Sequence, residues 1–209
     1  MLSLFNFDRE YITKGHTLIG GIDEAGRGPL AGPVVAACVI LSEDFYIDGL
    51  NDSKKLTEAA RNRIFKELLY NKAVGIGVGM ATNEEIDSVN ILNATRAAMK
   101  RAVADVPVRP QLLLIDAVKL KDIDIKQVSI IKGDEKSASI AAASVVAKVV
   151  RDSIMRGYHK TYPQYGFIRH KGYGTKEHMA NIKEHGPCEI HRMTFAPVAA
   201  LKEKILFAQ

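Results

Sequence analysis

Residues 17–41 read TLIGGIDEAGRGPLAGPVVAACVIL, which is two apolar runs on either side of a loop of glycines and prolines. Runs rich in β-branched residues and bounded by glycine and proline are typical of β-strands. The sequence therefore predicts two adjacent strands, over residues 17–23 and 34–41, joined by this loop. The first of them ends in a pair of acids, Asp23 and Glu24.

Further strands and helices are predicted on the C-terminal side of this pair. A capping box at Thr82 and Glu85 precedes one helix, and the apolar run 112–115 is typical of a strand buried on both faces. This order predicts an α/β fold, with a mixed five-stranded sheet flanked by helices and a helical C-terminal region. The other expected elements are strands over 73–81 and 127–132, and helices over 57–70, 91–104, 137–155 with Gly157 as its stop, 175–185, and from Pro197 towards Phe207.

Length and composition limit the class of protein. A chain of 209 residues with 47% hydrophobic and 25% charged residues is long enough for one packed domain and too apolar for a disordered one. No run approaches the roughly 20 apolar residues that span a bilayer, and the N-terminus lacks the pattern of a secretory signal. Cys38 and Cys188 form neither a disulfide framework nor paired metal-ligand spacing, so we expect two buried thiols. We expect a single domain over 1–209, located in the cytoplasm without membrane association.

Positive charge is concentrated in residues 148–192. Nine lysines and arginines accompany four acids there, whereas the rest of the chain carries twenty of each kind. The same window holds five of the six histidines and four tyrosines. It predicts either a surface that binds a polyanion, with tyrosine rings for stacking, or a merely solvated basic face. We expect residues from about 157 to 209 to form a basic helical region.

Four acids stand at or just after the ends of predicted strands. They are Asp23, Glu24, Asp116 and Asp134. Ligand sites of open α/β sheets lie outside the carboxyl ends of the strands, so these acids should converge and repel one another unless protons or cations intervene. Hard oxygen ligands favour Mg²⁺ or Mn²⁺, and such a cluster beside a basic strip matches two-metal phosphodiester hydrolysis.

Each acid also has a purely structural alternative. Asp134 could be the N-cap of the long helix, and Asp116 could start the turn before Lys119. As a set, the acids favour the metal site. Because successive strand residues point to opposite faces, Asp23 and Glu24 cannot both face one metal from a regular strand. We therefore expect the first strand to end or twist at this pair.

The loop that follows these acids is not a nucleotide-binding loop. Residues 23–33 lack the Gly-Lys-Ser/Thr of a Walker loop and the G-x-G-x-x-G spacing, which disfavours binding of nucleoside triphosphates. Gly26 and Gly28 instead leave backbone groups open to a closely approaching ligand around Arg27. The alternative is a tight hairpin connection with an exposed arginine.

These residues resemble the ribonuclease HII family, the type 2 ribonucleases H. The resemblance covers nearly the whole chain. It rests on residues 23–28, Asn51-Asp52-Ser53-Lys54, Leu114-Ile115-Asp116, Lys132-Gly133-Asp134, the helix through Lys148, His170-Lys171-Gly172-Tyr173-Gly174-Thr175 and Ile190-His191-Arg192.

The resemblance implies a ribonuclease H-like fold and endonucleolytic cleavage of RNA in RNA/DNA hybrids, including single ribonucleotides embedded in duplex DNA. Cleavage on the 5′ side of the ribonucleotide would leave a 3′-hydroxyl and a 5′-phosphate, and would serve ribonucleotide removal and RNA primer processing. The four acids would be catalytic and would bind two Mg²⁺ or Mn²⁺ ions, one activating water and the other stabilising the leaving oxygen. Gly26, Arg27, Gly28 and Tyr173 would contact the ribose 2′-hydroxyl and the RNA-to-DNA junction.

Three further residues and two other functions complete the expectations. Lys54 and Lys148 are candidate phosphate contacts, and His191 has no evident role in a metal-driven reaction, so we interpret it as structural. A catalytically inactive protein that binds hybrid or duplex is the main alternative, but it would tolerate loss of an acid. A small-molecule phosphoesterase explains the acids and leaves the basic, aromatic window unexplained. We expect a monomer.

Overall fold

The computed structural model describes the backbone of residues 2–206 and the side chains of residues 3–201. The strands are β1 (Ile19–Ala25), β2 (Val34–Leu41), β3 (Val74–Ala81), β4 (Leu112–Asp116) and β5 (Lys126–Ile130). The helices are α1 (Leu2–Ile12), α2 (Glu58–Tyr70), α3 (Asn83–Val89), α4 (Ile91–Asp105), α5 (Ala138–Thr161), α6 (Phe167–His170), α7 (Lys176–His185) and α8 (Ala196–Leu206), with short 3₁₀ turns η1 (Gly133–Glu135) and η2 (Pro163–Tyr165).

The strands form a five-stranded sheet in the order β3-β2-β1-β4-β5. β2 runs antiparallel to both β1 and β3, whereas β4 is parallel to β1 and β5 is parallel to β4. The predicted α/β fold with a mixed five-stranded sheet is confirmed. Parallel pairing brings the carboxyl ends of β1 and β4 to the same edge of the sheet, and both strands carry acids at that end.

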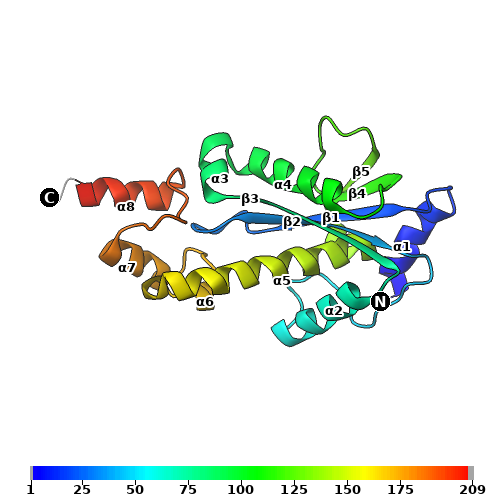
Figure 1. The fold of residues 1–209 in the computed structure, drawn as a ribbon, viewed down its shortest axis with the longest axis horizontal. Coiled ribbons are helices and arrows are strands. Elements are labelled where there is room, and N and C mark those ends of the chain that lie inside the picture. Colours follow the sequence, from blue (N-terminus) through cyan, green and yellow to red (C-terminus); the bar gives the residue numbers. More distant parts are fainter. Residues whose placement is uncertain (1, 207–209) are drawn as a thin grey trace.

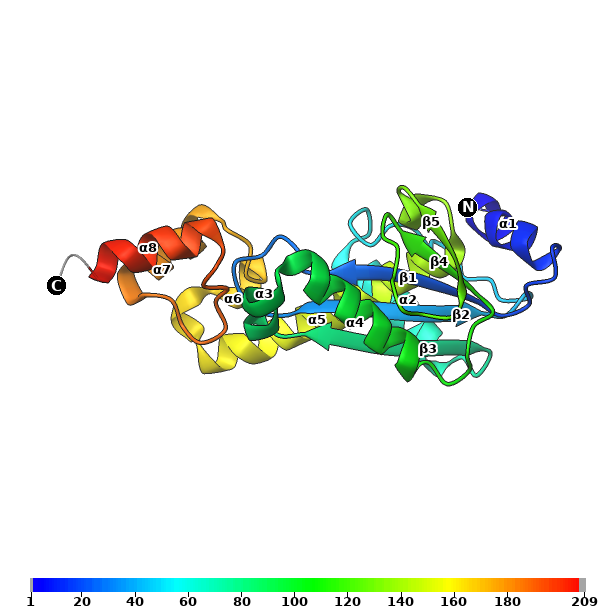
Figure 2. The same cartoon turned by 90° about the horizontal axis from the view of Figure 1, so that it is seen from above.

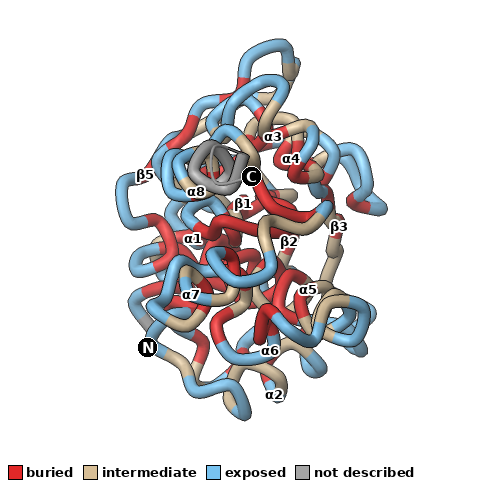
Figure 3. Tube along the Cα trace, turned by 90° about the vertical axis from the view of Figure 1, so that its left-hand side faces the viewer, coloured by how far each residue is buried: buried red, intermediate tan, exposed pale blue. Residues whose placement is uncertain are grey.

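Helices cover both faces of the sheet (Figure 1): α4 packs on β2 and β3, and α5 packs on β1 and β2 from the other side. Side chains of β2 alternate between the two cores. Ala37 and Val39 join the cluster under α5, while Ala36 and Cys38 join the cluster under α4. Burial on both faces explains why β2 is an unbroken apolar run. In Figure 3 the buried residues accordingly concentrate in the sheet and in α5.

Glycines allow the helices to approach the sheet closely. A Cβ atom at Gly79 would lie 2.1 Å from the Ala98 carbonyl oxygen, and one at Gly21 would lie 2.1 Å from the Ser139 carbonyl carbon. The first turn of α5 therefore rests directly on β1, two residues before Asp23. Asp8 of α1 adds a second contact there, because its Oδ2 accepts the Ser139 N–H at 2.8 Å.

The C-terminal helices gather at the end of the molecule opposite the N-terminus, where α5 extends beyond the sheet (Figure 2). They share a hydrophobic cluster with the loop between β1 and β2, to which Leu30 and Ala31 contribute alongside Met155, Phe167 and Ile182. The loop that the sequence analysis singled out is thus packed against the C-terminal region.

Several element ends differ from the sequence-based expectation. α5 continues past Gly157 to Thr161, because an exposed glycine costs a helix only about 1 kcal/mol. Pro163, which cannot continue a helix, follows its end. β5 ends at Ile130, since Lys132 takes a left-handed conformation with a φ of 55°. The α1 helix was not anticipated, and the predicted end of the last helix at Phe207 lies outside the described residues.

The two cysteines have different surroundings. Cys38 is buried, as expected, but Cys188 is only partly buried, so the prediction of two buried thiols is wrong for the second. Cys188 lies in the connection after α7, with its Sγ 3.1 Å from His191 Nδ1. Within residues 2–206, none of the helices combines the length and apolarity that crossing a bilayer requires.

Candidate active site

The four predicted acids come from β1, from the end of β4 and from η1. Pairing between β1 and β4 reaches Ile22 opposite Ile115, so the next residues of that register are Asp23 and Asp116. Asp134 follows β5 within η1, whose Gly133 N–H donates to Asp116 Oδ1 at 2.8 Å. The sheet register and this hydrogen bond bring acids from three separate stretches of the chain to one edge of the sheet.

β1 does not end at the acid pair, which excludes the first of the two alternatives, an end or a twist of the strand, that the sequence analysis offered. It remains paired with β2 as far as Ala25 opposite Val35. Asp23 lies opposite Ala37 on the α5 face, where it hydrogen bonds Ser144, and Glu24 lies opposite Ala36 on the other face. What stops before Asp23 is the pairing with β4, and the open edge that results leaves room for both side chains to approach Asp116.

Burial and mutual repulsion raise the pKa values of three of these acids. Burial is the largest cause for Asp23, followed by the charges of Glu24 and Asp116. Burial also raises the pKa of Glu24, although the Arg27 guanidinium opposes it. The pKa of Asp134 is raised by burial and then by the nearby Asp52 and Asp116 carboxylates. Such a cluster is costly to keep ionised and is typical of a functional site.

The donor set fits a hard divalent cation. All four acids offer oxygen, and Glu24 Oε2 is buried without a hydrogen-bond partner among the residues that the structure describes. Lys54 supplies positive charge to the cluster, with its Nζ 3.6 Å from Asp134 Oδ2. Within the part of the chain that the structure describes, no three His, Cys, Asp or Glu side chains are already placed to share a metal. Metal binding by these acids therefore stays a prediction.

The structural alternatives considered for Asp134, as a helix N-cap, and for Asp116, as the start of a turn, do not account for these acids. The N-cap of α5 is Ser137, whose Oγ accepts the Ile140 N–H at 3.3 Å, so Asp134 does not cap this helix. Asp116 binds the Gly133 N–H instead of a donor in the turn before Lys119. Both carboxylates are thus oriented by contacts at the edge of the sheet.

Two buried arginines hold the glycine loop in place. The Arg192 guanidinium donates to the carbonyl oxygens of Gly26, Arg27 and Gly32 at 2.6–3.0 Å. Arg151 donates to the carbonyl oxygens of Ala31, Pro33 and Lys171 at 3.0–3.1 Å. Neither side chain is exposed to solvent. Gly26 has a φ of 101°, and a Cβ there would lie 2.0 Å from Arg151 Nε, so only glycine fits.

A groove of about 280 Å³ runs beside the acids. Its lining comes from β1, the glycine loop, the 51–56 loop, α5 and the loop before α7, and consists of Glu24, Ala25, Gly26, Arg27, Gly28, Ser53, Lys54, Lys148 and Tyr173. The structure thus brings all six predicted substrate contacts together around one acid of the cluster. Tyr173 keeps 45% of its surface exposed, and its ring lies 5.9 Å from the Arg151 guanidinium carbon.

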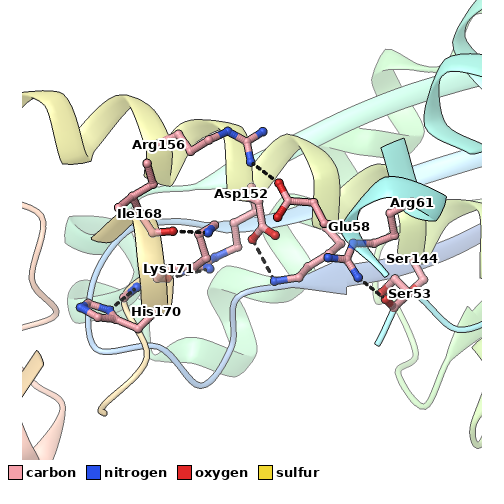
Figure 4. Close-up of polar contacts among 12 residues, drawn as sticks. Ser53, Glu58, Arg61, Ser144, Asp152, Arg156, Ile168, His170 and Lys171 are labelled. Atoms are coloured by element: carbon pink, nitrogen blue, oxygen red, sulfur yellow. Dashed lines mark hydrogen bonds and ion pairs between the residues drawn. The ribbon is translucent and has the colours of Figure 1, made fainter. Parts of the chain in front are cut away.

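The basic window contributes less free charge than the sequence suggested. Arg151 and Arg192 are buried, and Lys148 pairs with Asp152 at 2.8 Å. Figure 4 shows this face, where Arg156 also contacts Glu58 at 3.3 Å and the Lys171 ammonium donates to the Ile168 carbonyl oxygen. Of the four tyrosines, Tyr173 is exposed, whereas the other three pack in the cluster under the glycine loop.

Sequence reasoning missed several residues that shape the site. Asp52 is buried beside Asp134, and Ser144 of α5 hydrogen bonds both Asp23 and Ser53. The polar loop 51–56 was a usable signal for Asp52, because it stands between apolar elements and carries both an acid and lysines. Nothing local distinguishes Arg151 from a surface base, whereas Arg192 stands in the motif Ile190-His191-Arg192, which the family resemblance had singled out without giving it a role.

The fold is that of the ribonucleases H. The solved structure of ribonuclease H2 from Pyrococcus horikoshii OT3 matches with a TM-score of 0.74 and 25% identity, over 90% of this chain and 99% of that chain. Bst-RNase HIII, solved in complex with Mn²⁺, matches with a TM-score of 0.69 and 20% identity, over 93% of this chain and 71% of that one. The class is therefore that of an endoribonuclease built on a ribonuclease H fold.

Sequence comparison identifies the family. A family model described as Ribonuclease HII matches residues 20–198. Ribonuclease HII of Acetivibrio thermocellus is 57% identical over 93% of this chain and 75% of its own length. The protein of the same name from Clostridioides difficile is 56% identical over 90% of this chain and 74% of its own length. The chain belongs to the ribonuclease HII family, which confirms the resemblance drawn from the motifs.

Proposed function

We propose that this endoribonuclease uses divalent metal to cleave the RNA strand of RNA/DNA hybrids and single ribonucleotides embedded in duplex DNA. Cleavage on the 5′ side of the ribonucleotide leaves a 3′-hydroxyl and a 5′-phosphate, in ribonucleotide removal and RNA primer processing. The observation that carries the proposal is the cluster of four acids, coupled through their charges, beside a groove lined by bases and one exposed tyrosine.

The acids are proposed to hold two Mg²⁺ or Mn²⁺ ions. Asp23 and Asp116 stand at one edge of the sheet, and Glu24 presents an oxygen that has no protein partner. When bound, the ions supply an activated water and stabilise charge on the leaving oxygen. Asp134 contributes a fourth carboxylate after exchanging its present contact with Lys54.

Recognition of the ribonucleotide is proposed to depend on the glycine loop and Tyr173. A 2′-hydroxyl is the feature that marks RNA, and backbone groups at Gly26 and Gly28 can approach it closely around Arg27. The Tyr173 ring would pack on the neighbouring deoxyribose, where a second hydroxyl would be crowded. Lys54 and Lys148 would each exchange a carboxylate partner for a substrate phosphate.

The basic helical region from about 157 to 209 is proposed to extend the substrate-binding surface of a single monomeric domain. Its packing against the glycine loop supports this role. A non-catalytic protein that binds hybrids would use the same surface but would have no need for several acids with raised pKa values, so catalysis is favoured.

A duplex that contains one ribonucleotide tests the proposal. We expect cleavage at that nucleotide with Mg²⁺ or Mn²⁺, none in EDTA, and recovery when the metal is returned, because repelling carboxylates need cations to bind a phosphodiester. An all-DNA duplex and a nitrophenyl phosphate are the controls. Metal-independent cleavage, or hydrolysis of the nitrophenyl ester alone, would refute the proposal.

Substitution of Tyr173 tests the junction contact. Tyr173→Ala is expected to lower cleavage at an isolated ribonucleotide about tenfold, because stacking of one ring on a nucleotide contributes roughly 1–3 kcal/mol. Tyr173→Phe keeps the ring and should cleave at nearly the parental rate. The measurement is kcat/KM on the singly substituted duplex for the three proteins. Equal values for parent and alanine variant would remove Tyr173 from the junction.

A further inference from the structure

Three buried histidines lie directly behind Tyr173, and none of them has a part in the proposed chemistry. His178 and His191 are fully buried, and His170 is 8% exposed. The rings of His170 and His178 stack with centroids 4.4 Å apart and an interplanar angle of 19°. His178 Nε2 lies 3.1 Å from His191 Nε2. The cluster joins α6, α7 and the connection after α7 at the back of the groove.

The hydrogen-bond partners assign a single tautomer to His178. Its Nδ1 lies 2.9 Å from the Tyr173 carbonyl oxygen, which can only accept, so Nδ1 carries a proton. In a neutral ring Nε2 is then an acceptor, and the His191 Nε2 facing it must donate. Burial lowers the pKa of each ring to about 4, so both rings are neutral at pH 7.

His191 extends this chain of hydrogen bonds, which we call the relay. With its proton on Nε2, His191 has an acceptor at Nδ1, and the Cys188 N–H donates to that atom at 2.9 Å. The relay therefore runs from the Cys188 amide through His191 and His178 to the Tyr173 carbonyl, and the Cys188 carbonyl oxygen, 3.2 Å from the same His191 Nδ1, makes a longer contact there than the amide does. Protonation of His178 would place two N–H groups opposite each other at the central bond, and protonation of His191 would place a second N–H opposite the Cys188 amide.

His170 holds the other side of Tyr173. Its Nε2 donates to the Tyr165 carbonyl oxygen at 2.8 Å, and its Nδ1 accepts the Gly172 N–H at 3.2 Å. The His170 carbonyl oxygen also accepts the Tyr173 N–H at 2.9 Å. The Tyr173 N–H is thus held by the backbone of His170, and the Tyr173 carbonyl by the His178 imidazole together with the Thr175 N–H at 2.8 Å.

We infer that His178 is a positioning residue that sets how sharply the enzyme distinguishes an RNA-to-DNA junction, by holding the Tyr173 backbone through the relay from His191. The inference rests on the proposed junction role of Tyr173. The tyrosine ring is 45% exposed at the groove, so its position there depends strongly on the backbone that carries it. A small displacement of a positioned group lowers a rate markedly.

A matched pair of substitutions isolates the hydrogen bond to Tyr173. The side-chain nitrogen of asparagine takes the place of Nδ1, and that of glutamine takes the place of Nε2. His178→Asn keeps the donor to the Tyr173 carbonyl, whereas His178→Gln loses it, and both remove the ring from the stack on His170. The readout is the ratio of kcat/KM on a singly substituted duplex to kcat/KM on a uniform RNA/DNA hybrid.

We expect His178→Asn to keep the parental ratio and His178→Gln to lower it about fivefold, the worth of one lost hydrogen bond. Equal ratios in the two variants would overturn the inference, whether both are parental or both are lowered. Tyr173→Ala is measured in parallel. A parental ratio in Tyr173→Ala would refute the junction role itself. If Tyr173→Ala lowers the ratio but His178→Gln keeps the parental ratio, the relay alone is refuted.

Nitrogen NMR of the unmodified protein provides a test that needs no variant to fold. At pH 7 His178 is expected to carry its proton on Nδ1, and His191 on Nε2. The reverse assignment at either ring, or rapid exchange between tautomers, would contradict the relay.

Discussion

Asp23→Asn is expected to abolish cleavage and, in the absence of divalent ions, to raise the stability of the folded protein. The loss of activity should be roughly a thousandfold or more, because the amide removes one of the charges that would bind metal next to the scissile phosphate. The gain in the free energy of unfolding should be about 1–2 kcal/mol, because the variant no longer buries a carboxylate that Glu24 and Asp116 repel.

The sign of the pH dependence follows from the raised pKa of Asp23. The folded parent binds this proton more tightly than the unfolded chain does, so the parent loses stability as the pH rises through the raised pKa. Asparagine does not titrate. The stability advantage of the variant should therefore be largest at neutral pH and close as the pH falls towards 3.8, the ordinary pKa of the group.

Urea unfolding in EDTA at pH 7 and pH 5, together with cleavage assays in Mg²⁺, measures both effects. Asp122→Asn is the matched control, since that carboxylate is 86% exposed and pairs with Lys100 at the surface. A variant that cleaves at nearly the parental rate would remove Asp23 from the site. If the variant is less stable than the parent, the Asp23 carboxylate stabilises the fold and is a structural group.

Arg192→Met should have the largest effect on folding. The substitution removes the donors from carbonyl groups of Gly26, Arg27 and Gly32 that are held by this one side chain. A buried acceptor without a partner costs roughly 1–3 kcal/mol, so we expect the free energy of unfolding to fall by about 3 kcal/mol. The glycine loop would lose its shape, and cleavage should fall about a hundredfold in the protein that remains folded.

Arg9→Met is the control for this change, because Arg9 is exposed on α1, where its guanidinium donates a hydrogen bond to Asn6 at the surface. It should shift the unfolding free energy by no more than about 0.5 kcal/mol. Arg192→Lys adds a second comparison: the charge is kept, but an ammonium cannot span three carbonyls as the planar guanidinium does. An Arg192→Met protein that unfolds at the parental urea concentration would show that the loop carbonyls have found other partners.

Sequence periodicity and end signals predicted most of the secondary structure. The capping box at Thr82 and Glu85 forms, and Thr57 and Thr175 cap the helices that follow them. These signals depend on residues a few positions apart, so they are legible along the chain. The predicted helix stop at Gly157 was wrong because it, too, was a local signal. The turns of α5 on either side of this glycine are held by packing on the sheet and on the C-terminal helices, which overrides the signal.

The four acids show both what the sequence predicts and what it leaves undetermined. Their position after apolar strands made them recognisable, since a carboxylate at the end of a buried run has little to gain from packing. That β1 continues through Asp23 and Glu24 to Ala25 while its pairing with β4 stops at Ile22 could not be predicted, because it depends on the register of both neighbouring strands. Register between strands 90 residues apart along the chain is not encoded in either strand alone.

Short-range patterns and apolar periods along the chain were enough to predict the strands, the capped helices, the family motifs and the acids at the strand ends. Which bases are buried supports and which are surface charge became apparent from the packing of the folded chain. Arg151 and Arg192 leave solvent because carbonyl groups of a distant loop converge on them, and His178 has one tautomer because its two ring nitrogens face Tyr173 and His191. Such environments are created by chain segments that meet in space, so the free energy of a buried polar side chain is set by partners that its neighbours in sequence do not reveal.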